Sequence, residues 1–342
     1  MTNAADPPRG AHPAHAIDIH AHYYPRAFLD LIAANAAACG IEYREVEGKG
    51  PQFKIGYLAT GPVGPRFTDD DARLEAMQAQ HVAVHLLSLS QPMVYWAGRD
   101  LAQRLTETYN DAIAQAHERH PQRLFGLATL PMHEPDLAVR EAERAARLPG
   151  VRGYYMATHV RERDLSDPAL FPVYECIEAL GLPVFLHPVE VIGHQRLTPH
   201  YLTNLLGNPF ESAIAASHLI FGGVLDRFRT LTFCLPHAGG AFPWLAGRLQ
   251  RGWEKRADLR HLELEGPAAY LRRFYYDTVG YSGDVLEYLV RVIGADRVLM
   301  GSDYCFPIAY EQPVEVVSAH PGLTEQDKQR ILDGNARRLL KI

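Results

Sequence analysis

The stretch AIDIHAHYYP (residues 16–25) contains a short apolar run that ends in two histidines one residue apart. The apolar run favours a β-strand, in which alternate side chains point to the same face. Ile17 and Ile19 would then share one face, and Asp18, His20 and His22 the other. Two imidazoles on one face form half of a metal site, although an isolated pair of this kind is more often ordinary surface or hydrogen-bonded histidine.

The same order of a short apolar run followed by a helical segment occurs eight times along the chain. Regular alternation of strand and helix predicts a parallel sheet with helices outside it, and eight units favour a closed (β/α)8 barrel of the TIM type. An open doubly wound sheet is the alternative, but no GxGxxG motif follows the first run, where a dinucleotide site would need it. The eight runs span residues 16–19, 82–87, 124–129, 151–155, 183–186, 231–235, 274–277 and 297–300.

No linker or change of composition divides these units, so we predict a single domain over residues 16–342. Residues 1–15 form a polar N-terminal segment that we expect to be a flexible tail, and His12 and His15 within it are weak ligand candidates. Residues 40–68 are rich in Gly and Pro and predict an irregular insertion or a small hairpin after the first helix. Thr68 is expected to cap the helix that follows this insertion.

The composition excludes several classes of function. With 47% hydrophobic and 22% charged residues, the 342-residue chain is typical of a soluble globular protein. A net charge of −6 without a basic run argues against a nucleic-acid partner. No apolar stretch has membrane-spanning length, and the N-terminus lacks the apolar core of a signal peptide. The four cysteines contain no CxxC pair, which is typical of reduced thiols in a cytoplasmic protein.

Further histidines and an acid follow the later apolar runs. His187 follows the fifth run, His237 the sixth and Asp303 the eighth. The carboxyl ends of the strands share one rim of a (β/α)8 barrel, so these residues should meet His20 and His22 there. Imidazole and carboxylate ligands suit a divalent ion such as Zn²⁺. Each residue alone could cap a strand or form a turn, but the five together favour a metal site.

Seven segments resemble the amidohydrolase superfamily and, within it, the 2-amino-3-carboxymuconate-6-semialdehyde decarboxylase family with its γ-resorcylate and 5-carboxyvanillate decarboxylase relatives. The resemblance runs from about residue 16 to the C-terminus and keeps the order and spacing of the motifs. HAGGAFP together with GSDYCFP is its most specific part. The segments are DIHAHYYP, QPMVYWAGRD, RLFGLATLPM, LFPVYECIEALGLPVFLHP, FGGVLDRF, LPHAGGAFPWLAGRL and RVLMGSDYCFP.

The resemblance implies a role for each residue at the rim. His20, His22, His187 and Asp303 would bind one divalent metal ion, Zn²⁺ in the first place and Mn²⁺ as the alternative. His237 would be the catalytic acid/base, with Asp303 as the second catalytic residue. The hydrolytic members of the superfamily carry a carboxylated lysine after the fourth strand, and VRGYYMATHV (residues 151–160) has none. A mononuclear site is therefore expected.

Substrate contacts follow the family pattern less closely. Arg248 aligns with a family arginine that reaches the site of a neighbouring subunit, which implies a homodimer. Lys54 and Asn204 stand near positions where the family has an arginine and a tryptophan, so the substrate is expected to differ. Phe306 and Trp96 are candidates for lining the pocket, although each could equally be a core residue.

These observations lead to one main hypothesis and one alternative. The main hypothesis is a metal-dependent non-oxidative decarboxylase, a carbon–carbon lyase, that acts on a small carboxylated aromatic or muconate-semialdehyde-like acid. The alternative is a metal-dependent hydrolase or hydratase of a related ring-cleavage product, because fold does not fix function. The complete ligand set argues against a catalytically silent scaffold protein.

Overall fold

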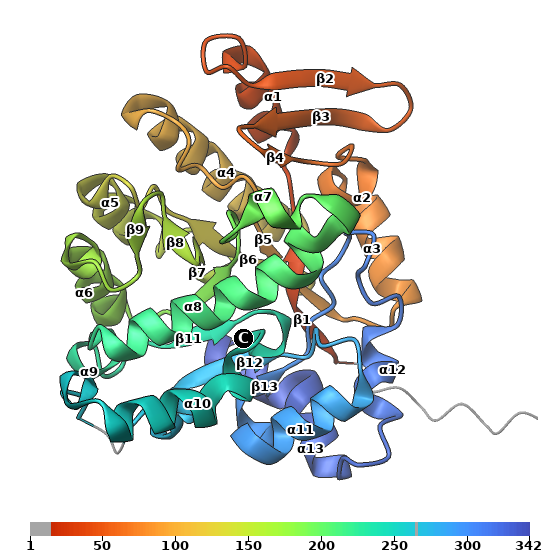
Figure 1. The fold of residues 1–342 in the computed structure, drawn as a ribbon. Helices are drawn as coiled ribbons and strands as arrows, with labels where there is room; N and C mark the ends of the chain where they lie inside the picture. The colour runs from red at the N-terminus through yellow and green to blue at the C-terminus, as the bar shows by residue number, and fades with distance from the viewer. Residues whose placement is uncertain (1–14, 264–265) are drawn as a thin grey trace, which may run out of the picture.

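The computed structural model describes residues 15–263 and 266–342. Eight parallel strands form one sheet, with helices between successive strands, and this confirms the predicted (β/α)8 barrel (Figure 1). The strands, in their order around the barrel, are β1 (Ile17–His22), β5 (Val84–Ser88), β6 (Leu124–Thr129), β7 (Val151–Ala157), β10 (Val184–His187), β11 (Phe233–Leu235), β12 (Phe274–Asp277) and β13 (Val298–Leu299).

The helices pack on the barrel through faces that the sequence spacing sets. In α4 (Arg99–Arg119), Leu105, Tyr109 and Ile113 recur every four residues and are buried. The other helices are α1 (Arg26–Asn35), α2 (Pro65–Thr68), α3 (Asp70–Ala79), α5 (Pro135–Ala145), α6 (Phe171–Leu180), α7 (His194–Leu197), α8 (Asn208–Phe221), α9 (Val224–Arg227), α10 (Phe242–Lys255), α11 (Gly283–Ile293), α12 (Pro313–Ser318), α13 (Glu325–Gln329) and α14 (Asn335–Leu340).

Asp69, and not Thr68 as expected, caps helix α3. The backbone of Asp69 is extended, with φ −115° and ψ 129°, and its side chain accepts a hydrogen bond from the Ala72 amide. Thr68 is itself the last residue of α2, so its backbone is already helical and cannot serve as the cap.

The insertion after α1 forms a small sheet of its own. Its three antiparallel strands are β2 (Glu42–Val46), β3 (Gly50–Ile55) and β4 (Leu58–Ala59), and the sheet projects from one end of the barrel (Figure 1). The Tyr57 ring, in the turn between β3 and β4, stacks on His194 at a centroid distance of 3.9 Å. The insertion is therefore anchored to the long excursion that follows β10.

The barrel closes between its last and first strands by few backbone bonds. The Ile19 amide donates to the Met300 carbonyl at 3.0 Å, the Tyr304 amide donates to the His20 carbonyl at 3.2 Å, and the His22 amide donates to the Tyr304 carbonyl at 2.6 Å. β13 itself contains two residues and pairs only with β12 among the named strands. We call the junction of residues 17–22 with residues 300–304 the seam.

The two histidines of the predicted N-terminal tail fall at and before the start of the described chain. His12 lies outside the described residues, and His15 is exposed at the start of the described chain. In the described part of the chain, no helix has the combination of length and apolar character that crossing a membrane requires.

Candidate metal centre

The five residues singled out at the strand ends lie together. One ligand atom from each of His20, His187, His237 and Asp303 lies within 4.8 Å of the others. His22 is outside that set of four but borders it, because its Nε2 atom is 3.1 Å from His20 Nε2 and 3.0 Å from Asp303 Oδ1. The parallel strands thus bring residues that are up to 283 positions apart in sequence to one rim.

Local backbone geometry turns these side chains inward. Alternation along β1 places His20 and His22 on the same face. His237 and Asp303 adopt positive φ angles of 56° and 64°, a strained conformation that is concentrated at functional sites. The HAGG segment after β11 needs its glycines, because a Cβ atom at Gly240 would lie 2.1 Å from the Pro209 carbonyl oxygen.

The hydrogen bonds of two histidines fix which ring nitrogen faces the cluster. Nδ1 of His20 lies 2.7 Å from Asp277 Oδ2, and Nδ1 of His187 lies 2.7 Å from the Pro188 carbonyl oxygen. Both oxygens accept, so each Nδ1 carries a proton and each Nε2 faces the cluster, where a cation would take its lone pair. Lone pairs that converge with the Asp303 carboxylate fit a divalent cation, which these nitrogen and oxygen donors would hold.

Burial sets the charge of the histidines. It lowers the pKa of His22 and His187 well below the usual value, so both are neutral and able to act as ligands. Burial and the neighbouring His20 also lower the pKa of His237. For His20 burial acts in the same direction, but the Asp277 hydrogen bond and the Asp303 charge outweigh it and raise its pKa. Burial raises the pKa of Asp303.

Asp277 belongs to the site and was missed by the sequence analysis. Its Oδ2 atom accepts from the His20 ring and from the His237 amide at 3.0 Å, while Oδ1 accepts from the Ala238 amide at 2.7 Å. A carboxylate behind a ligating histidine orients the ring and increases its basicity. The signal was present, because Asp277 ends the seventh apolar run at the position where the other candidates were found.

Aromatic side chains surround the cluster. The Phe306 ring lies 4.9 Å from that of His22, and the Tyr155 ring lies 5.7 Å from that of His187. Tyr281 Oη donates to Asp303 Oδ2 at 3.4 Å, so the other carboxylate oxygen faces the imidazoles. These walls suit a flat, partly apolar ligand.

The other predicted substrate residues have partners outside the histidine cluster or none among the described residues. Arg248 is exposed on α10 and has no ion pair or hydrogen bond with the described residues. Lys54 pairs with Glu42 at 2.7 Å on the exposed insertion. Asn204 is half-buried in the π-helical turn 203–207, and Trp96 packs on the core and donates to the Met93 carbonyl. Within the described chain, Phe306 is the one of these five predicted residues that contacts the histidines.

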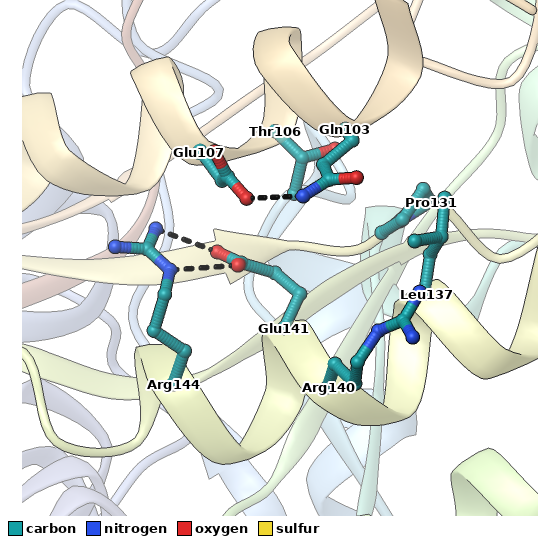
Figure 2. Close-up of a pocket in the computed structure, with 8 residues that line it drawn as sticks. All are labelled: Gln103, Thr106, Glu107, Pro131, Leu137, Arg140, Glu141 and Arg144. Atoms are coloured by element: carbon teal, nitrogen blue, oxygen red, sulfur yellow. Dashed lines mark hydrogen bonds and ion pairs between the residues drawn. The ribbon is translucent and has the colours of Figure 1, made fainter. Parts of the chain in front are cut away.

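A separate pocket of about 190 Å³ lies between α4 and α5 (Figure 2). Arg144 and Glu141 form an ion pair at 2.8 Å on one side of it, and Gln103 bonds to Glu107 on the other. Because none of the five residues at the rim lines this pocket, it is distinct from the candidate metal centre.

Comparison with known proteins places the chain in a family. Residues 17–342 match the family described as Amidohydrolase. The chain is 34% identical over 276 residues to the 2-amino-3-carboxymuconate-6-semialdehyde decarboxylase of Dictyostelium discoideum, covering 80% of this chain and 77% of that protein. It is also 24% identical over 355 residues to the 2-keto-4-carboxy-3-hexenedioate hydratase of a Sphingobium strain, covering 94% and 95% of the two chains.

Solved structures agree with this placement. The crystal structure of 5-carboxyvanillate decarboxylase from Sphingomonas paucimobilis superposes with a TM-score of 0.82 at 27% identity, covering 96% of this chain and 100% of that one. Two other decarboxylases of this fold, from Polaromonas and Novosphingobium aromaticivorans, were solved with bound manganese. The chain therefore belongs to the amidohydrolase family, and its relatives include metal-dependent decarboxylases of carboxylated aromatic acids.

Proposed function

We propose that this protein is a metal-dependent, non-oxidative decarboxylase of a small carboxylated aromatic or muconate-semialdehyde-like acid. The observation that carries the proposal is the convergence of imidazole nitrogens with the Asp303 carboxylate beside His237. The similarity to the Dictyostelium discoideum decarboxylase over most of both chains supports the same reaction type.

The ligands in this proposal are His20, His22, His187 and Asp303, with His237 as the acid/base. One divalent ion, Zn²⁺ or alternatively Mn²⁺, would polarise a substrate oxygen or activate water when bound. The carbon–carbon bond to the departing CO₂ breaks, and its electron pair remains on the substrate carbon, which must then take up a proton. His237 is neutral because burial lowers its pKa, so it can take a proton from water, leaving hydroxide, and deliver that proton to the carbon.

The surroundings of the cluster support the proposed substrate class and assembly. Phe306 and Tyr155 offer flat apolar walls for an aromatic or conjugated acid. Arg248 has a free guanidinium among the described residues, which supports a homodimer in which it binds a carboxylate at the partner's site. Lys54, Asn204 and Trp96 stay predicted substrate contacts. The four cysteines are unpaired, which supports a cytoplasmic location.

A hydratase is the second candidate, because the Sphingobium relative spans nearly the whole of both chains. Water addition and decarboxylation can use the same centre, since a bound ion activates water for either. The alternative would need His237 to deprotonate water rather than to protonate carbon.

The discriminating experiment supplies metal-loaded protein with candidate acids and measures CO₂ release and water addition in parallel. The acids are 2-amino-3-carboxymuconate-6-semialdehyde, 2,6-dihydroxybenzoate and 5-carboxyvanillate, with 2-keto-4-carboxy-3-hexenedioate for the alternative. We expect one CO₂ per substrate consumed with at least one of the first three, and none with the His237→Ala variant. Hydration of the fourth acid, without CO₂ from the other three, would overturn the proposal.

A further inference from the structure

A fully buried arginine lies directly behind the histidine cluster. Arg73, on α3, has no exposed surface and is the largest side chain buried to this degree. Its guanidinium lies between the rings of Tyr23 and Tyr304, at 5.4 and 5.0 Å from their centroids. Nη2 donates to the backbone carbonyl of His22 at 2.5 Å. A permanent positive charge is thus fixed to the strand that carries two of the proposed ligands.

The next residue in the cluster is His85, which is buried in β5. Arg73 Nη1 lies 3.2 Å from His85 Nδ1, and a guanidinium can only donate, so Nδ1 accepts. The ring proton is therefore on Nε2, which lies 3.7 Å from the carboxylate of Asp18, too far for a hydrogen bond, and has no hydrogen-bond partner among the described residues. Burial and the Arg73 charge lower the pKa of His85 well below its usual value, so the ring stays neutral between the two charges.

Asp18 completes the cluster and bridges the seam. Its Oδ1 atom accepts from the His20 amide at 2.9 Å and from the Ser302 amide at 3.1 Å. Its Oδ2 atom accepts from the Ser302 hydroxyl. One carboxylate thereby joins β1 to the segment immediately before Asp303, where the strands themselves share few backbone bonds.

Arg73 and Asp18 are both without solvent contact, and a buried charged group is tolerated only when hydrogen bonds satisfy it. Each of the two charged side chains also forms a hydrogen bond with the backbone of a segment that carries proposed ligands. Arg73 holds the His22 carbonyl, and Asp18 holds the His20 and Ser302 amides. The cluster therefore sets the distance between the two sides of the proposed metal centre.

We propose that Asp18 and Arg73 are positioning residues that hold His20, His22 and Asp303 at metal-binding separation. This inference rests on the proposed function, since it concerns the same metal centre. It differs from a purely structural role in one measurable respect. Loss of either charge lets the two sides of the seam move apart, which weakens metal binding in molecules that are still folded.

The test measures the dissociation constant of Mn²⁺ for the metal-free protein by competition with a chelator. The variants are Asp18→Asn and Arg73→Gln, each of which removes one charge, and circular dichroism establishes that each is folded. We expect Mn²⁺ affinity to fall about 10- to 100-fold in both, the usual effect of removing groups that orient metal ligands. Glu141→Gln is the matched control, because it makes the same change of a buried carboxylate to an amide in an ion pair away from the cluster, and should leave Mn²⁺ affinity unchanged.

Two further variants keep the inference testable if Asp18→Asn does not fold. Ser302→Ala removes one hydrogen-bond donor to Asp18 and should weaken Mn²⁺ binding less than Asp18→Asn does. Asp18→Asn combined with Arg73→Gln removes both charges and should restore folding but not Mn²⁺ affinity. Unchanged affinity in every folded variant would overturn the inference and leave the proposed function intact, and so would an equal loss in Glu141→Gln. Absence of Mn²⁺ binding by the unaltered protein would instead overturn the proposed function.

Discussion

Neighbouring strands of this barrel are joined in two different ways. Between β7 and β10 the backbones pair over four consecutive residues, from Tyr154 with Val184 to Ala157 with His187. At the seam between β13 and β1, a few backbone bonds are supplemented by the Asp18 side chain, which binds the Ser302 amide and hydroxyl. His20, His22 and Asp303 all lie at the seam, where side chains replace part of the backbone ladder.

The histidines of the two regions differ in their partners. At the seam, His20 bonds to Asp277, and His22 lies 3.0 Å from Asp303. We call the part of the barrel whose strands pair through their backbones, from β5 to β10, the wall. In the wall, His133 follows β6, bonds to the Ala97 carbonyl and has Arg161 as its main charged neighbour. A histidine paired with carboxylates keeps a lone pair available for a cation, whereas one beside an arginine does not attract a cation. His187 also lies in the paired strands and is a proposed ligand through its bond to the Pro188 carbonyl, so the contrast holds between the seam histidines and His133. The seam histidines should bind metal, and His133 should make the fold sensitive to acid.

Removing both histidines of β1 should have the largest effect. In the variant with His20→Ala and His22→Ala, two of four proposed ligands are lost, so metal content should fall from about one equivalent to below about 0.1, and activity to background. Metal analysis of the purified protein checks this. The matched control replaces His159 and His194, which line a different surface pocket, by alanine. A full equivalent of metal in the β1 variant would contradict the assignment of the ligands.

His237→Ala should be the next largest effect and distinguishes an acid/base from a ligand. Its ring belongs to the set of four mutually close ligand atoms, whereas His22 borders that set. As the acid/base, its loss should lower kcat about 100-fold or more at unchanged metal content. His22→Ala, measured beside it, should lose metal. If His237→Ala loses metal in step with activity, His237 is a ligand, and normal turnover would exclude it from the chemistry.

Asp277→Asn should have an intermediate effect. The amide keeps the size of the carboxylate but removes the charge that orients the His20 ring, and we expect a 10- to 100-fold loss of metal affinity. The hydrogen bonds from the His237 and Ala238 amides should survive in part, because one side-chain oxygen remains. Metal competition and the temperature of unfolding are measured together. A drop in unfolding temperature without any loss of metal affinity would show that Asp277 only supports the loop.

The sequence was sufficient for the barrel and for the five residues at its rim because both depend on local patterns. Apolar runs alternate with helical segments, and parallel strands place their carboxyl ends together whatever the details of packing. His20, His22, His187, His237 and Asp303 therefore converge as expected. Asp277 met the same criterion, because it ends the seventh apolar run, but it was not among the predicted site residues.

Features that depend on packing between distant segments could not be read from the sequence. Arg73 lies in the segment DDARLEAMQA, whose charges are typical of a solvated helix, yet its side chain is fully buried. Its partners, the His22 carbonyl and the His85 ring, come from two strands and become neighbours only in the folded barrel. The pairing of Lys54 with Glu42 likewise depends on the register of β2 and β3, which the Gly- and Pro-rich insertion does not specify.

His133 provides the smallest predicted effect and tests the wall side of the comparison. Burial, aided by the Arg161 charge, lowers the pKa of His133 from 6.5 to about 4. Between these values the unfolded chain binds a proton that the folded chain does not, so stability falls as the pH falls from 6.5 toward 4. At pH 5.5, one unit below the unfolded pKa, this costs about 1.4 kcal/mol of unfolding free energy relative to pH 8.

His133→Gln can still donate to the Ala97 carbonyl but cannot titrate. Denaturant unfolding at both pH values, in the same metal state, should therefore show that the variant loses about 1.4 kcal/mol less than the unaltered protein between pH 8 and pH 5.5. Equal losses in the two proteins would mean that the acid sensitivity of the fold resides in histidines other than His133.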